Sequence, residues 1–166
     1  MSIKNSEELE GLREVGRIVA STLKRMLAFV RPGITTQELD DLGRVHFEAY
    51  GARSAPQLTY GFPGATCISL NHEAAHGIPK NRAVCAGDLI NIDVSLELNG
   101  YFADTGASMC VEPARTELGD LCRASKEVLS AALSQIRPGS RINSIGRTIE
   151  QESNRRGYRV IRNLAG

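Results

Sequence analysis

The residues best suited to chemistry are two carboxylates, Asp93 and Asp104, which lie in otherwise apolar runs of the chain. Between them stands Asn99-Gly100, the strongest short-range signal for a two-residue hairpin turn. Such a turn places Ser95 opposite Asp104 and Asp93 opposite Gly106. Both aspartates are therefore predicted to project from the same face of a two-stranded ribbon.

Diagonal neighbours on such a ribbon lie about 7–8 Å apart, which lets two carboxylates converge on one metal ion or on a pair. Aspartate is disfavoured in strands, and two of them on one face repel each other unless a cation neutralises them. The alternative is a solvated face, or a bulge near Gly106 that Asp104 caps. Two carboxylates alone do not complete a catalytic site.

A loop before the hairpin carries two histidines, His72 and His76, the residue type that exchanges protons near neutral pH. Residues 72–76 read His-Glu-Ala-Ala-His and match the helical HExxH zinc motif. Their context argues against a helix, because a strand-like Ile68-Ser69-Leu70 precedes them and Gly77 and Pro79 follow. The zinc-helix reading stays open as an alternative, as does a purely structural role for either histidine.

Helical periodicity precedes this region. Apolar residues recur every three or four positions from Leu9 to Val30, with Asn5 or Ser6 as the cap and Arg31-Pro32-Gly33 as the stop. A capping box of Thr35 and Glu38 opens a second helix, which is expected to run to about Tyr50. Between about 54 and 112 the helical period disappears, and short apolar runs predict a sheet.

Beyond Pro113 the helical period returns and stops at a second Arg-Pro-Gly, residues 137–139. The two Arg-Pro-Gly triplets lie 106 residues apart, and Gly51 and Gly157 are separated by the same number of residues. This repeated spacing indicates an internal duplication. The chain is therefore read as one incomplete domain, with residues 1–112 as a first half-repeat and 113–166 as the start of a second. A sheet built from one half exposes an edge and an apolar face, so we expect low stability or self-association.

Composition fits a globular chain of one domain: 166 residues, 42% hydrophobic, with a formal charge of +1. No apolar run approaches the roughly 20 residues of a membrane span, and the first residues do not resemble a signal peptide, so we expect a cytoplasmic protein without a membrane partner. The four cysteines occur singly, and no disulfide is expected. Seven arginines against two glutamates between Arg137 and Arg162 are more typical of a solvated helix face than of a nucleic-acid surface, so no specific nucleic acid is expected.

Three motifs together resemble type I methionine aminopeptidases: Ala75-His76-Gly77-Ile78-Pro79, Asn91-Ile92-Asp93-Val94 and Asp104-Thr105. The resemblance runs through essentially the whole chain. It implies an α/β (α+β) pita-bread fold, a duplicated arrangement with its metal site at the centre. It also implies removal of the initiator methionine from nascent polypeptides, with two divalent metal ions drawn from Co, Mn, Fe or Zn. A monomer with the ribosome as a further contact is the arrangement that the family implies.

Carried over residue by residue, the resemblance makes Asp93 and Asp104 the first two metal ligands and His76 the residue that contacts the scissile amide. Tyr60, Phe62 and Cys67 lie on or beside the family's methionine-side-chain pocket, and Thr59 stands where a tyrosine is often found. The remaining ligands, one histidine and two glutamates, would follow Gly166, since residues 163–166 resemble the run just before that histidine. We therefore expect the chain as written to lack three of five ligands and not to hydrolyse peptides.

Two other functions compete with this one. A non-catalytic pita-bread protein would contact ribosome, RNA or nascent chains through the arginine stripe, but it would have no need of Asp93, Asp104 and His76. A relative of Xaa-Pro aminopeptidases or creatinase is disfavoured by the pattern at 75–79 and by the lack of a domain before residue 1.

Overall fold

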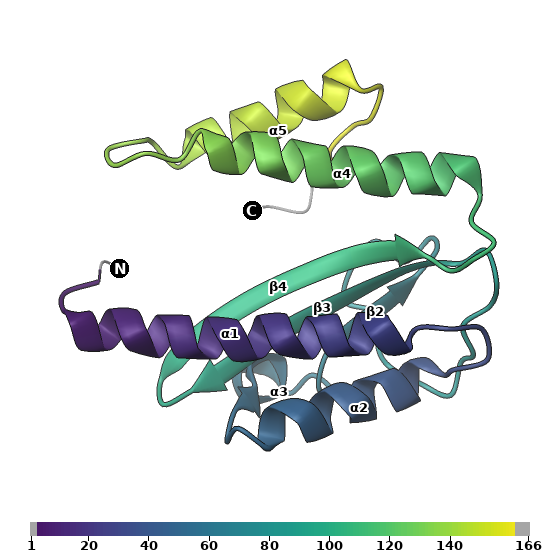
Figure 1. The fold of residues 1–166 in the computed structure, drawn as a ribbon, viewed down its shortest axis with the longest axis horizontal. Helices are drawn as coiled ribbons and strands as arrows, with labels where there is room; N and C mark the ends of the chain where they lie inside the picture. The colour runs from purple at the N-terminus through teal and green to yellow at the C-terminus, as the bar shows by residue number, and fades with distance from the viewer. Residues whose placement is uncertain (1–2, 162–166) are drawn as a thin grey trace. The chain divides into compact units, whose positions relative to one another are not determined.

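The computed structural model describes residues 3–161 and divides into two compact units, Met1–Ala114 and Arg115–Gly166 (Figure 1). The first unit contains the sheet that carries Asp93 and Asp104, and the second consists of two helices. Residues 163–166, which resemble the segment before the family's third metal ligand, lie outside the described residues. Within residues 3–161, no helix is long and apolar enough to cross a membrane.

The first two helices begin at caps that the sequence predicts. The α1 helix (Ser6–Phe29) starts where the Asn5 side chain accepts a hydrogen bond from the backbone N–H of Glu8. The α2 helix (Thr36–Glu48) starts at the reciprocal capping box of Thr35 and Glu38. Caps of this kind satisfy backbone donors that have no partner within the helix, so they fix where each helix begins.

The sheet is built around one long central strand. β3 (Leu89–Leu98) pairs with β4 (Tyr101–Cys110) on one side and with β2 (Cys67–Leu70) and β1 (Arg53–Ser54) on the other, and every pairing is antiparallel. The predicted turn is confirmed: Asn99 and Gly100 both have positive φ, and Leu98 lies opposite Tyr101. Among the described residues, β4 pairs with β3 alone and forms an edge of the sheet.

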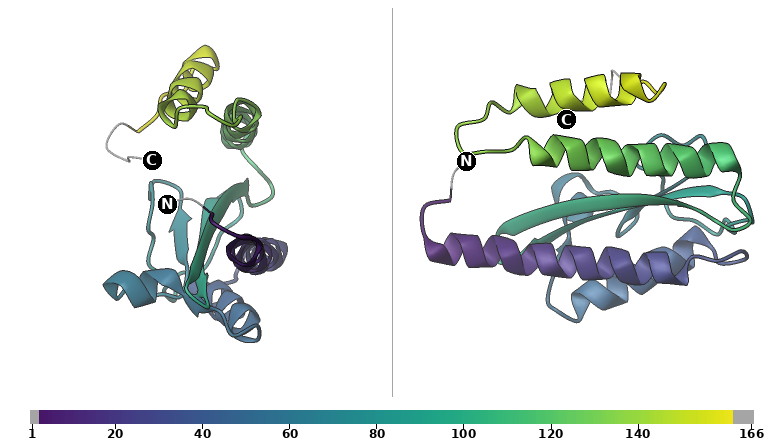
Figure 2. Two further views of the ribbon diagram at one scale, coloured as in Figure 1. Left: turned by 90° about the vertical axis from the view of Figure 1, so that its left-hand side faces the viewer. Right: turned by 45° about the horizontal axis from the view of Figure 1, so that its top comes forward.

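The two faces of β3 differ in chemistry because side chains alternate along a strand. One face carries five apolar side chains that are buried in the core beneath α1 and α2: Ile90, Ile92, Val94, Leu96 and Leu98. The α1 helix lies along this face of the sheet in Figure 2, and α2 packs against α1 and contacts β1 and β2. The other face, which we call the polar face, carries Asn91, Asp93, Ser95 and Glu97 from β3, and Asp104 and Ser108 from β4.

A short helix interrupts the region predicted to be entirely sheet. The α3 helix (Ala55–Tyr60) is capped by Ser54, whose hydroxyl accepts from the backbone N–H of Gln57, and Pro56 stands in its first turn. Gly61 closes it in the left-handed conformation. The prediction of strands alone between 54 and 112 is therefore wrong at 55–60, where a cap, a proline and a glycine specify a helix too short to show periodicity.

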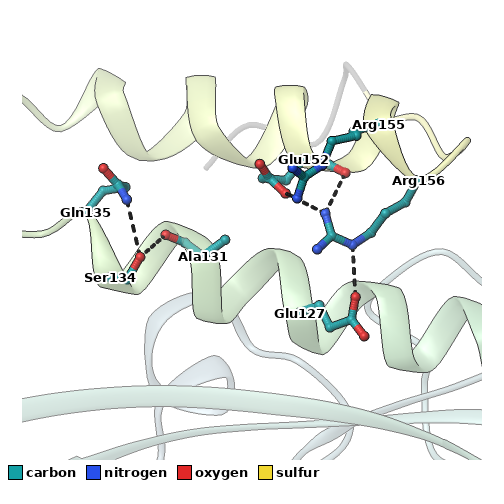
Figure 3. Close-up of polar contacts among 7 residues, drawn as sticks. All are labelled: Glu127, Ala131, Ser134, Gln135, Glu152, Arg155 and Arg156. Carbon is teal, nitrogen blue, oxygen red and sulfur yellow. Dashed lines mark hydrogen bonds and ion pairs between the residues drawn. The ribbon is translucent and has the colours of Figure 1, made fainter.

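The second unit consists of α4 (Thr116–Ser134) and α5 (Asn143–Arg155), joined through the second Arg-Pro-Gly turn. Arg156 links the two helices (Figure 3). Its Nε donates to the Glu127 carboxylate on α4, and its Nη1 donates to both the carboxylate and the backbone carbonyl of Glu152 on α5. Arg155 also pairs with Glu152. Two arginines of the basic stripe therefore serve contacts within this unit.

Candidate functional site

Asp93 and Asp104 meet on the polar face of the hairpin as the sequence predicts. Asp93 lies opposite Gly106 and Ser95 lies opposite Asp104, so the two carboxylates are diagonal neighbours on adjacent strands. Asp93 is half-buried and Asp104 is exposed. The hairpin places an inner and an outer carboxylate on the same face of the sheet.

The electrostatics confirm that the two carboxyl groups interact. Burial, together with the negative charge of Asp104 and hydrogen bonding to it, raises the pKa of Asp93 to about 6, while the nearby His76 opposes the shift. Two carboxylates this close cannot both ionise without repulsion, which a divalent cation between them would relieve. Their oxygen donors suit such a cation, so these residues fit part of a divalent metal site.

His76 lies in a loop that is fastened to strand β2. The Gly77 carbonyl accepts from the backbone N–H of Ile68 at 2.9 Å, and the Gly77 N–H donates to the hydroxyl of Ser69 at 3.0 Å. A Cβ on Gly77 would lie 2.2 Å from the carbonyl oxygen of Ile68, so only glycine permits this approach. His76 itself has a φ of 52°, a conformation that non-glycine residues seldom adopt without support. The loop is therefore fixed against β2, and His76 lies near enough to Asp93 to oppose the rise in the pKa of its carboxyl.

The zinc-helix interpretation of residues 72–76 is wrong. These residues form a turn followed by irregular backbone, so His72 and His76 do not share a helical face. Glu73, which would be the base of that motif, accepts from the backbone N–H of Leu70 and from Arg82. Its carboxylate tethers the loop instead of facing a metal.

Two of the predicted pocket residues, Cys67 and Tyr60, interact with the carboxylates, and Phe62 contacts Tyr60. Cys67 is buried directly opposite Asp93 in the β2–β3 ladder, and Tyr60 contacts Phe62 edge-on with ring centroids 6.2 Å apart. Burial raises the pKa of the Tyr60 hydroxyl, and the negative charges of Asp93 and Asp104 add to the shift. Thr59, in contrast, donates its hydroxyl to the Ala55 carbonyl of its own helix.

A buried carboxylate that sequence reasoning did not single out holds the segment that leads to Cys67. Asp40 on α2 accepts three hydrogen bonds, from the backbone N–H groups of Ala65 and Thr66 and from the Thr66 hydroxyl, at 2.6–3.0 Å. Thr66 precedes Cys67, so Asp40 fixes the entry of the chain into β2. The partners lie 25 and 26 residues away in the sequence, and no local pattern signals such a contact.

The carboxylate pair is not joined by further metal-binding side chains in the part of the chain that the structure describes. Across residues 3–161, no three histidine, cysteine, aspartate or glutamate side chains converge as a metal cluster. These residues therefore provide two carboxylates, a histidine that interacts with Asp93, and a buried thiol opposite Asp93.

Comparison of the sequence and the structure with known proteins identifies the family of this chain. The sequence pattern of metallopeptidase family M24 matches residues 10–166. The chain is 42% identical over 167 aligned positions to methionine aminopeptidase 2 of Bacillus subtilis, covering 100% of this chain and 67% of the relative. The chain thus spans about two thirds of the length of the curated relatives that it matches.

Solved structures show the same fold. A methionine aminopeptidase from Thermotoga maritima superposes with a TM-score of 0.95 at 28% identity, over 100% of this chain and 67% of that one. A prolidase from Pyrococcus furiosus shares the fold alone, with a TM-score of 0.82 at 19% identity, over 94% of this chain and 45% of the prolidase. The prediction of an α/β pita-bread fold is confirmed.

The fold and the carboxylate pair thus define the class as the M24 metallopeptidases, whose pattern covers nearly all of the sequence. The chain belongs to this family and groups within it with the methionine aminopeptidases. Membership of a metallopeptidase family implies the use of divalent metal ions.

Proposed function

We propose that this chain forms the part of a methionine aminopeptidase that supplies two metal-binding carboxylates, and that the protein removes the initiator methionine from nascent polypeptides. The observation that supports this most directly is the placement of Asp93 and Asp104 as diagonal neighbours on one face of the hairpin. Two divalent ions, drawn from Mn, Fe, Co or Zn, are the proposed cofactors, because carboxylate and imidazole donors accept all four.

Each residue has a role that its surroundings support. Asp93 and Asp104 would hold the metal, which when bound polarises the scissile carbonyl and lowers the pKa of the attacking water. His76, exposed in its tethered loop beside Asp93, would hold or give a proton at the scissile amide. Tyr60, Phe62 and the buried Cys67 would form the wall that receives the thioether side chain of methionine.

Metal binding tests the carboxylate assignment. Mn²⁺ is titrated by calorimetry into the wild type, Asp93→Asn, Asp104→Asn and a control, Asp41→Asn, which removes an exposed α2 carboxylate paired with Arg44. We expect Mn²⁺ binding in the wild type and the control, and its loss in both hairpin variants. Equal binding in all four proteins would contradict the assignment.

Release of methionine from a Met-Ala-Ser peptide, measured alongside, tests the activity. The assay uses the complete aminopeptidase with all five metal ligands, in which His76→Ala is expected to abolish metal-dependent release and His72→Ala to leave it unchanged. L-methionine added to labelled protein should shift the amide resonances around Cys67 and Tyr60 more than norvaline does. A matching response to both amino acids would contradict the proposed pocket.

A further inference from the structure

Two hydrogen-bonded pairs cross the hairpin on its polar face, one on each side of Asp93. Towards the open end of the hairpin, Asn91 Nδ2 donates to the hydroxyl of Ser108 at 3.0 Å. Towards the turn, the Ser95 hydroxyl donates to Oδ1 of Asp104 at 2.7 Å. The second pair joins a neutral side chain to one of the two carboxylates of the site.

The Ser95 hydroxyl gives Asp104 a hydrogen-bond donor from its direct cross-strand partner, and Asp93 has no such donor on its own partner, Gly106. Ser95 and Asp104 are direct cross-strand partners, so the hydroxyl reaches the carboxylate without distorting either strand. A hydrogen bond to an ionised carboxylate is charge-assisted and about twice as strong as a neutral one. The cross-strand partner of Asp93 is Gly106, which has no side chain to donate a hydrogen bond. A Cβ added at Gly106 would lie 3.3 Å from Asp93 Oδ1.

Asp104 needs such support more than Asp93 does. Asp93 is half-buried between its neighbours on the central strand, whereas Asp104 is exposed on the edge strand. An exposed aspartate samples several side-chain rotamers, and a metal site loses affinity when a ligand must be ordered on binding. A donor fixed to one oxygen leaves the other oxygen free to bind.

We propose that Ser95 is a positioning residue that holds the Asp104 carboxylate by Oδ1 in one rotamer and leaves Oδ2 available to a divalent cation. The rotamer preference stands on the structure alone, and its effect on metal binding rests on the proposed function. Hydrogen bonds to ligating carboxylates of this kind typically contribute about 10–100-fold to metal affinity.

The test compares Ser95→Ala with Ser95→Thr, which keeps the hydroxyl, and Ser108→Ala, which breaks the other cross-strand pair. Three-bond couplings to the Asp104 carboxyl carbon, measured by NMR without metal, report its χ1 rotamer. We expect one rotamer in the wild type, Ser95→Thr and Ser108→Ala, and averaged couplings in Ser95→Ala. Ser95→Cys, nearly isosteric with a weak S–H donor, should behave like the alanine variant and replaces it if that variant does not fold.

Mn²⁺ affinity gives the second readout, with a loss of roughly tenfold expected in Ser95→Ala and no loss in Ser95→Thr. Unchanged Asp104 couplings in both Ser95→Ala and Ser95→Cys would overturn the inference, as would equal averaging in Ser108→Ala. A wild type that fails to bind Mn²⁺ would count against the proposed function, and the couplings would still decide the role of Ser95.

Discussion

Cys67 lies directly opposite Asp93 across strands β2 and β3, so a thiol and a carboxylate face each other at the wall of the candidate site. Burial raises the pKa of the Cys67 thiol to about 11, and the negative charges of Asp93 and Asp104 add to the shift. The thiol is therefore held in its neutral, apolar form, which suits a pocket wall and not a nucleophile.

This environment predicts slow alkylation of Cys67. At pH 8 a thiol with a pKa of about 11 is only about 0.1% ionised, and Cys67 is buried whereas Cys85 is exposed to the reagent. With iodoacetamide and peptide mass spectrometry, we expect Cys85 to react well before Cys67. Asp93→Asn should speed the reaction at Cys67, because it removes a charge that disfavours the thiolate. Equal rates at Cys67 and Cys85 in the wild type would contradict the described burial.

Gly77→Ala should detach the histidine loop from the sheet. The new Cβ would meet the Ile68 carbonyl at 2.2 Å, and overpacking of this kind costs about 1–3 kcal/mol. Amide exchange at Ile68, whose N–H donates to Gly77, should accelerate. Gly16→Ala on α1 is the control, since nothing lies within 4 Å of its Cβ and alanine should stabilise that helix by about 0.5–1 kcal/mol. Equal stability of the two variants in urea would contradict the close approach.

Asp40→Ala should loosen the segment that leads into β2. It leaves two buried backbone N–H groups and one hydroxyl without their acceptor, a loss of about 3 kcal/mol or more in the free energy of unfolding. Asp40→Asn retains one carbonyl acceptor and should lose less. Chemical denaturation measures both losses, and an alanine variant as stable as the wild type would show that water replaces the carboxylate.

Glu97 should contribute stability that depends on pH. Its carboxylate accepts from Arg53 Nε at 2.8 Å and from the backbone N–H of Gly100 at 2.6 Å, and these bonds lower the pKa of Glu97 in the folded protein. The stabilisation is therefore complete above the unfolded pKa, near 4.3, and is lost as the pH falls through the lower folded value.

Glu97→Gln should accordingly lower the melting temperature at pH 7 and have little effect near pH 3. Thermal unfolding at both values distinguishes this from a simple packing defect, which would lower the melting temperature equally at each pH.

Arg156→Ala should separate the two helices of the second unit more easily than Arg155→Ala does. Arg156 bridges Glu127 on α4 and Glu152 on α5, whereas Arg155 contacts Glu152 within one helix (Figure 3). Amide exchange across Thr116–Ser134 should rise in Arg156→Ala alone. Arg156→Lys should not restore protection fully, because an ammonium group lacks the planar fork that bonds both partners. The same exchange pattern in both alanine variants would contradict the role of Arg156 in linking α4 to α5.

The parts of the fold that the sequence predicts are those whose causes are local. Asn99-Gly100 specifies a turn with two positive φ values, and that turn alone fixes the register that brings Asp93 and Asp104 together. The caps at Asn5 and Thr35 are local in the same sense. The α3 helix had local signals as well, at Ser54 and Pro56, but six residues are too few for periodicity to show.

The parts that the sequence does not predict depend on contacts between distant segments. In the sequence, Asp40 is one of several polar residues of a helix, and nothing near it predicts a buried role. Its role depends on the tertiary contact between α2 and Ala65. The positive φ of His76 depends on how Gly77 meets Ile68, which is a tertiary contact. The assignment of Asp93, Asp104 and His76 to metal and substrate stays a prediction.

The two-residue turn at Asn99-Gly100 also makes the site sensitive to the length of the chain. Substitutions along β4 can preserve the face on which Asp104 lies, because that face depends on the number of residues counted from the turn. One residue inserted between Gly100 and Asp104, unless a bulge absorbs it, would turn Asp104 toward the core and leave Asp93 alone. Along this hairpin, a substitution leaves the face of Asp104 unchanged, whereas a change of one residue in the spacing reverses it.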